Sequence, residues 1–236
     1  MDIIFPIIGG LFALTIPVLI IGGIIYLVSK LGGVSSIKFS FRAAMRVYFY
    51  VVLLISVGLF SIGGLSTLLK VGFGEIVGPE FSYGEVYQEH RYEQEERQRE
   101  DYPAHLDGDP QTLPERIDLA IRGNIINGSS MAMIGLSLLV VHYFGRRWVE
   151  TEEESSDLMR RVYLFVGLII FTLVTLISLT AGIPETLKYA LLENELGEES
   201  PGETLAIAIV ALPIWLFYLI ETIRKERANR ALINPR

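Results

Sequence analysis

The stretch VYFYVVLLISVGLFSIGGLSTLL, from Val47 to Leu69, decides the class of this protein. It contains no Asp, Glu, Lys or Arg. About 20 residues at 1.5 Å rise per residue cross a hydrocarbon core of roughly 30 Å, so the stretch is long enough to span a membrane. In lipid, every backbone N–H and C=O must find a partner within its own segment, which favours a helix. The stretch therefore predicts a transmembrane helix.

Four further apolar blocks of similar length lie along the 236-residue chain, of which 51% is hydrophobic. They run from Ile3 to about Ser29, from about Ile125 to Phe144, from Val162 to Ala181 and from Thr204 to Ile220. Together the five blocks predict an all-α integral membrane protein with five transmembrane helices.

The first block is predicted to be a retained helix rather than a cleaved signal peptide. A signal peptide begins with basic residues and has an apolar run of about 7–15 residues. This chain begins with Met1-Asp2, and its apolar run is far longer. Two prolines and two glycine pairs in the block predict a kinked helix that a neighbouring helix approaches closely.

The distribution of basic residues predicts the orientation, because lysine and arginine concentrate in cytoplasmic connections. Thirteen of the 20 Lys and Arg lie in the connection 30–46, the connection 145–161 and the tail 221–236. These three segments fall on one side when five spans alternate. We therefore expect a multi-pass membrane protein with its N-terminus outside and its C-terminus in the cytoplasm.

An internal repeat is predicted by two similar entries into apolar helices. Arg46-Val47-Tyr48 opens one helix, and Arg161-Val162-Tyr163 opens another 115 positions later. Each helix is followed by an acidic segment and a returning helix, so the two halves run in the same direction and form parallel two-helix repeats. The predicted parts are an N-terminal helix (1–30), a first repeat (31–148) with a long acidic extracytoplasmic loop (about 71–124), a second repeat (149–223) and a basic tail (224–236).

The paired halves resemble an uncharacterised prokaryotic four-helix membrane-domain family. The resemblance rests on the two Arg-Val-Tyr entries and on Leu212-Pro213-Ile214-Trp215 in the final helix, and it covers roughly residues 40 to 225. That family is a domain of unknown function, common in filamentous anoxygenic phototrophs and their relatives. The resemblance implies a four-helix topology and a bacterial origin, and hence a place in the bacterial cytoplasmic (inner) membrane, but it implies no mechanism.

Two short segments outside the spans have helical patterns. Residues 113–122 are expected to form a short amphipathic helix with Pro114 in its first turn. Residues 184–196 fit either a short helix at the outer interface or a plain extension of the preceding span.

Composition removes several classes of function. There is no cysteine, which excludes disulfides, thiolate metal sites and thiol nucleophiles. The net charge of −7 is a poor match to nucleic acid. No catalytic motif for a metalloprotease, phosphate loop or nucleophile elbow is present, so the chain is not expected to be an enzyme.

Few residues are candidates for ligand chemistry inside the membrane. No charged residue lies in the central portion of a predicted span, whereas ion-coupled carriers normally need one. His142 is the candidate ligand for a metal macrocycle, with an interfacial, hydrogen-bonded histidine as the alternative. No cofactor and no metal site are otherwise predicted.

The small and hydroxyl residues of two spans have two interpretations each. Gly128, Ala132 and Gly135 form a small-residue face, which is typical of close helix packing. Thr172, Thr175 and Ser178 recur every three residues, which fits packing through hydrogen bonds or the lining of a polar pore.

The acidic outer loop favours a docking surface. His90, His105, Asp107 and Asp109 lie among many glutamates, but they do not follow the register of a calcium loop. The leading hypothesis is a non-catalytic accessory or scaffold subunit of a larger membrane complex, with the lipid bilayer, other membrane subunits and a basic extracytoplasmic partner as its contacts. The resemblance to a phototroph family implies a respiratory or photosynthetic host. The alternative is a homo-oligomeric channel or small-solute transporter.

Overall fold

A computed structural model describes residues 41–97, 111–150, 158–192 and 200–233. Within these ranges the chain is helical and contains no strand. The elements are α2 (Phe41–Gly58), the π-helix η1 (Leu59–Leu65), α3 (Ser66–Ile76), α4 (Pro79–Ser82), α5 (Gly84–Arg97), α6 (Leu113–Val149), α7 (Leu158–Leu191) and α8 (Pro201–Ile233).

Four of the described helices are long and apolar enough to cross a membrane. They are Met45–Ile76, Leu113–Val149, Met159–Leu191 and Pro201–Arg227. This confirms an all-helical protein of the multi-pass membrane type. The predicted first helix, residues 3–29, lies outside the described residues.

The first described span is one continuous rod of three segments. α2 passes into η1, in which the Ser66 N–H donates to the carbonyl of Ser61 five residues earlier, and η1 passes into α3. Such a wide turn accommodates one extra residue in a helix. The rod runs to Ile76, beyond the predicted end at Leu69, and this extension places Lys70 within the span.

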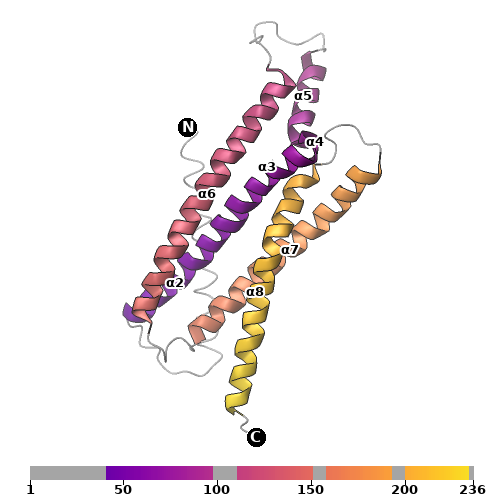
Figure 1. Ribbon diagram of the computed structural model, residues 1–236. Helices are drawn as coiled ribbons and strands as arrows, with labels where there is room; N and C mark the ends of the chain where they lie inside the picture. The colour runs from indigo at the N-terminus through magenta and orange to yellow at the C-terminus, as the bar shows by residue number, and fades with distance from the viewer. Residues whose placement is uncertain (1–40, 98–110, 151–157, 193–199, 234–236) are drawn as a thin grey trace.

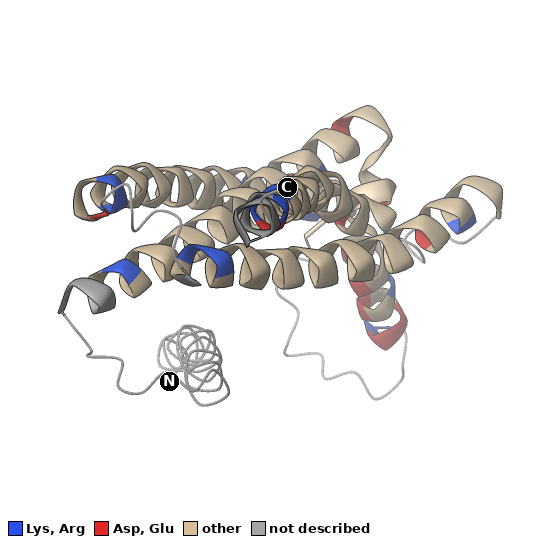
Figure 2. Ribbon diagram, turned by 90° about the horizontal axis from the view of Figure 1, so that it is seen from below, with Lys and Arg blue, Asp and Glu red and all other residues tan. Residues whose placement is uncertain are grey.

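Two helical hairpins make up the membrane part. α6 packs along the α2–η1–α3 rod, and α7 packs along α8. The hairpins meet where α3 contacts α8 and where α2 contacts α7 (Figure 1). We call the end where α3 stops and α8 begins the Lys70 end, and the end where α2 begins and α6 stops the Arg46 end. Charged residues gather toward the helix ends, leaving long uncharged stretches between them (Figure 2).

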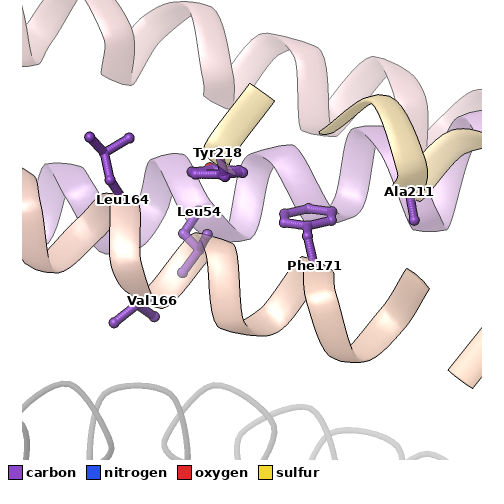
Figure 3. Close-up of a cluster of buried hydrophobic side chains, with 6 residues drawn as sticks. All are labelled: Leu54, Leu164, Val166, Phe171, Ala211 and Tyr218. Atoms are coloured by element: carbon purple, nitrogen blue, oxygen red, sulfur yellow. The ribbon is translucent and has the colours of Figure 1, made fainter. Parts of the chain in front are cut away.

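An apolar cluster joins the hairpins. The aromatic ring of Phe171 in α7 stacks on Tyr218 in α8, with centroids 5.6 Å apart. Gly167 makes room for this ring, because a Cβ there would lie 2.4 Å from Tyr218. Leu54 brings α2 into the cluster (Figure 3). The buried members are Leu54, Leu164, Val166, Phe171, Ala211 and Tyr218.

The outer segments are more helical than the predicted loop. Residues 113–122 are helical with Pro114 in the first turn, as expected, but they are continuous with α6. The Glu115 carboxylate accepts the Thr112 backbone N–H at 2.8 Å and fixes this start. α7 continues through Pro184 to Leu191, which agrees with the extension rather than a separate interfacial helix. The predicted loop 71–124 thus includes α4, α5 and the ends of two spans.

Candidate functional site

A buried lysine lies at the centre of a polar cluster at the Lys70 end. Lys70 of α3 is only 6% exposed. Its Nζ lies 3.0 Å from Glu85 Oε1 of α5 and 2.6 Å from Glu203 Oε2 of α8. One ammonium group therefore joins both hairpins and the outer helix, and the two carboxylates compensate its burial.

Tyr83 packs beside this ammonium group. Its ring lies under Lys70 Nζ, 5.4 Å from the centroid, and it is fully buried. Burial raises the pKa of the Tyr83 phenol, which keeps it neutral. Gly74 and Gly202 let the short helix α4 approach closely, since a Cβ at Gly74 would lie 2.8 Å from the Tyr83 ring and one at Gly202 would lie 2.8 Å from the Phe81 carbonyl. The turn after α3 is thus fixed against α8.

A second ion pair holds the far part of α5. Arg116 of α6 donates from both terminal nitrogens to the Glu93 carboxylate, and the Nη1–Oε1 distance is 2.9 Å. A paired-nitrogen contact of this kind fixes orientation as well as distance. Arg116 holds the pKa of the Glu93 carboxyl below its usual value. The 14-residue helix α5 is therefore fixed to α3 and to α6.

The rest of α5 is an exposed acidic surface. Glu89, Glu95 and Glu96 are exposed, and Tyr92 beside them is 67% exposed. We call these four residues the acidic face of α5. Within the described residues, the buried residue of α5 is Gly84, at the start of the helix, so no buried side chain lies on the acidic face.

A separate charged cluster closes the Arg46 end. Glu150 lies 3.6 Å from Arg46 Nε and 3.5 Å from Arg146 Nε, and its side chain is 8% exposed. Tyr50 donates its hydroxyl to Glu150 Oε1 at 2.6 Å. The Arg146 guanidinium also lies over the Tyr50 ring, 5.3 Å from the centroid. These contacts tie the start of α2 to the end of α6.

His142, the predicted macrocycle ligand, is buried between α6 and α2. Its Nδ1 lies 2.8 Å from the Leu138 carbonyl, and its Nε2 lies 3.1 Å from the Tyr48 hydroxyl. Because a carbonyl only accepts, the Nδ1–H donates to Leu138. Ligation of a macrocycle would require His142 Nε2 to give up its contact with Tyr48.

Two of the three predicted hydroxyl residues of α7 form hydrogen bonds within the protein. Thr172 donates to the Leu168 carbonyl at 2.6 Å and accepts the Trp215 indole N–H at 3.0 Å. Ser178 is buried and donates to the Val174 carbonyl at 2.8 Å. Thr175 is also buried, and its Oγ1 has no hydrogen-bond partner among the described residues. The structure thus brings Thr172 and α8 together.

The small residues of α6 lie where the rod approaches most closely. A Cβ at Gly135 would lie 2.5 Å from the Phe60 backbone nitrogen. A Cβ at Gly128 would lie 3.1 Å from Leu68, and Ala132 lies 2.7 Å from the Cβ position of Gly64. Glycine on both helices therefore permits backbone contact between α6 and η1.

Of the candidate residues in the outer loop, the structure describes only His90. Its Nε2 lies 3.0 Å from Gln94 Nε2 within α5. His105, Asp107 and Asp109 lie outside the described residues.

The buried position of Lys70 was not predicted from the sequence. It directly follows the predicted span end at Leu69, where a lysine is ordinarily an interfacial residue. Its partners are two glutamates 15 and 133 positions away in the sequence, and the approach of Glu203 depends on the two hairpins packing together.

Comparison with known proteins finds no relative. No family model matches the chain, and neither the curated proteins nor the solved structures include a match.

Proposed function

We propose that this protein is a non-catalytic scaffold or accessory subunit that presents the acidic face of α5 to a basic partner within a larger membrane complex. The observation that carries the proposal is that α5 is fixed by Lys70 of α3 and by Arg116 of α6, while Glu89, Glu95 and Glu96 stay exposed.

The attachment of α5 depends on its ion pairs. A helix that is polar all round has no apolar face to hold it on a protein, and an isolated helix of this length is marginal in water. Ion pairs to two different spans therefore supply its attachment. A rigid, acidic surface of this kind attracts a complementary basic surface and orients it.

The polar groups of the spans favour a scaffold over the alternative channel or transporter. Thr172 bonds to Trp215, and Ser178 bonds to its own helix. Lys70 is compensated by two carboxylates. These groups stabilise packing between helices, which is the commoner use of such residues in membranes.

The charges at the two ends support the proposed orientation. Arg147, Arg161 and Lys225 lie toward the Arg46 end, whereas the acidic face of α5 lies at the Lys70 end. By the positive-inside rule, the Arg46 end is cytoplasmic and α5 is extracytoplasmic.

We also propose that the two hairpins arose by duplication. Tyr48 of α2 contacts His142 of α6, and Tyr163 of α7 contacts Tyr218 of α8 at 2.9 Å. The two leading tyrosines are 115 positions apart, and their two partners are 76 positions apart. Each Arg-Val-Tyr entry thus bonds to the returning helix of its own hairpin.

A second contact also repeats in the two hairpins, but the offset between its leading residues is one position smaller. Leu68 lies against Gly128 in the first hairpin, and Gly182 lies against Thr204 in the second. The partners Gly128 and Thr204 are again 76 positions apart, but Leu68 and Gly182 are 114 apart. The offset is smaller by one because the first hairpin has one extra residue between Tyr48 and Leu68. η1 lies in this interval and accommodates one extra residue. In this account, α4 and α5 are an addition to one copy of the hairpin.

The proposal is tested by purifying the native protein in mild detergent and identifying what migrates with it by mass spectrometry. A stoichiometric membrane complex containing a subunit with a basic extracytoplasmic surface supports the proposal. A homogeneous assembly of this chain alone, which conducts ions or solutes in vesicles, would favour the channel instead.

A further inference from the structure

Lys70 binds two carboxylates that belong to different parts of the molecule. Its Nζ lies 3.0 Å from Glu85 of α5 and 2.6 Å from Glu203 of α8. An ammonium group has three N–H donors, so it can bind both carboxylates at once. The glutamate side chains are 57% and 58% exposed, whereas the lysine side chain is 8% exposed. The cation is thus enclosed by the protein, while each carboxylate is also accessible from solvent.

The second carboxylate makes the first one exchangeable. If Glu85 turns to another cation, Lys70 still has Glu203, so no buried charge loses its last counterion. The two carboxylates carry the same charge and repel each other beside the ammonium group. Departure of Glu85 therefore strengthens the Lys70–Glu203 pair, which joins α3 to α8.

Glu85 borders the acidic face of α5. It precedes Glu89 by four positions, and residues at this spacing are neighbours on a helix surface, with Cβ atoms about 5–6 Å apart. Both side chains are exposed. A cationic group that binds Glu89 consequently comes close to Glu85 and competes with Lys70 for its carboxylate.

The surrounding contacts hold the start of α5 in place when this carboxylate moves. Phe81 of α4 packs against the rings of Phe73 in α3 and Tyr189 in α7, with centroids 5.8 and 5.2 Å away. The Gly84 backbone N–H donates to Ser200 Oγ at 3.2 Å. The same hydroxyl donates to the Glu85 carboxylate at 3.3 Å, which is longer than an ordinary O–H···O hydrogen bond. Only the side chain of Glu85 therefore needs to change partner.

We propose that docking at the acidic face of α5 transfers Lys70 from Glu85 to Glu203 and so tightens the contact between the two hairpins. This inference rests on the proposed function, since it assigns an effect to the basic partner. Because coupling between two binding events is reciprocal, closer packing of α3 and α8 also frees Glu85 for that partner. One ammonium group thus links the docking surface to the membrane hairpins.

Hydrogen exchange of α8 tests the coupling in the purified full-length protein in a neutral detergent, with decalysine as the docking probe. Decalysine should slow exchange over residues 203–210 about two- to fivefold, which is the gain expected from a strengthened ion pair at the protein surface. The variant Glu85→Gln should slow the same amides without decalysine, because Lys70 is then left to Glu203. Added decalysine should still bind this variant but should slow its α8 amides no further.

Glu93→Gln is the matched control, because it removes another ion-paired carboxylate of α5, whose partner Arg116 belongs to the same hairpin as Lys70. Its α8 amides should still respond to decalysine. Faster exchange of α8 in Glu85→Gln would show that Glu85 only supports the junction, and it would overturn the proposal.

Calorimetric titration with decalysine separates failure of the coupling from failure of the docking surface. Bound decalysine with unchanged α8 exchange in the unsubstituted protein would overturn the coupling and leave the acidic face of α5 as a docking surface. Absence of decalysine binding would overturn the docking surface itself, and the coupling with it.

Discussion

Lys70 of α3 and Glu203 of α8, 133 positions apart in the sequence, meet through a 2.6 Å contact that joins the two hairpins. The same ammonium group also binds Glu85 of α5. Membrane packing and the attachment of the outer helix therefore share one buried charge.

Removal of both the Glu85 and the Glu203 carboxylates should lower the free energy of unfolding far more than removal of either one. Glu203→Gln and Glu85→Gln each leave Lys70 one partner, and we expect losses of about 1 kcal/mol or less for these half-exposed groups. The double variant leaves a buried ammonium uncompensated, and we expect a loss of about 3–5 kcal/mol. Thermal unfolding in detergent measures all three. Additive losses would show that Lys70 does not depend on the pair.

Backbone contact between α6 and η1 should not tolerate a side chain at Gly135. Gly135→Val places a Cβ 2.5 Å from the Phe60 nitrogen, so the helices must separate. We expect a loss of at least about 2 kcal/mol, in the range of overpacked sites. Gly72→Ala in α3 is the control, since a Cβ there meets nothing within 4 Å, and it should be neutral or stabilise by about 0.5–1 kcal/mol. Equal destabilisation by the two variants would contradict the contact.

The attachment of α5 to α6 should weaken in acid. The pKa of Glu93 is lowered by Arg116, so the stability from this pair is present above the unfolded pKa of about 4.3 and is lost as pH falls below it. The protection factors of the α5 amides, which correct exchange for its intrinsic pH dependence, should be constant between about pH 7 and 5 and should fall below about pH 4. Glu93→Gln should raise exchange at neutral pH and flatten the response. If the Glu93→Gln variant showed the same pH dependence of α5 exchange as the unchanged protein, the Glu93–Arg116 pair would not be what holds α5.

The proposed orientation predicts opposite labelling of two single cysteines. Glu96→Cys in α5 should react with a membrane-impermeant maleimide in intact cells, because α5 is predicted to be extracytoplasmic. Lys225→Cys in α8 should react only after the membrane is permeabilised. The reverse pattern would invert the topology and place the acidic face of α5 in the cytoplasm.

Apolar runs and basic flanks were sufficient to predict the helical class, and four of the predicted spans coincide with described helices. They could not predict η1 or the extension to Ile76, because an extra residue leaves no mark in an apolar run and Lys70 resembled an interfacial flank. The sequence also did not predict that α5 forms an ordered helix. Its sequence is that of a solvated charged run, and it is ordered by Lys70 and Arg116, whose positions depend on the packed spans.

Local spacing predicted some of the candidate residues correctly, but it could not predict contacts between residues far apart in the sequence. Local spacing identified Gly128 and Gly135 as candidate packing residues, and the structure places both against the rod. Local spacing did not predict that Tyr48 bonds to His142, since that contact joins residues 94 positions apart.

Co-purification with a charge-reversed α5 tests the central proposal most directly. The variant Glu89→Lys/Glu95→Lys/Glu96→Lys changes only exposed residues and leaves Glu85 and Glu93 in place. Glu75→Lys, an exposed charge reversal on α3 at the same end, is the control. If α5 docks a basic partner, native complexes should keep their stoichiometry with Glu75→Lys and lose the partner with the triple variant, while both proteins stay folded. Retention of every partner by the folded triple variant would contradict the proposal.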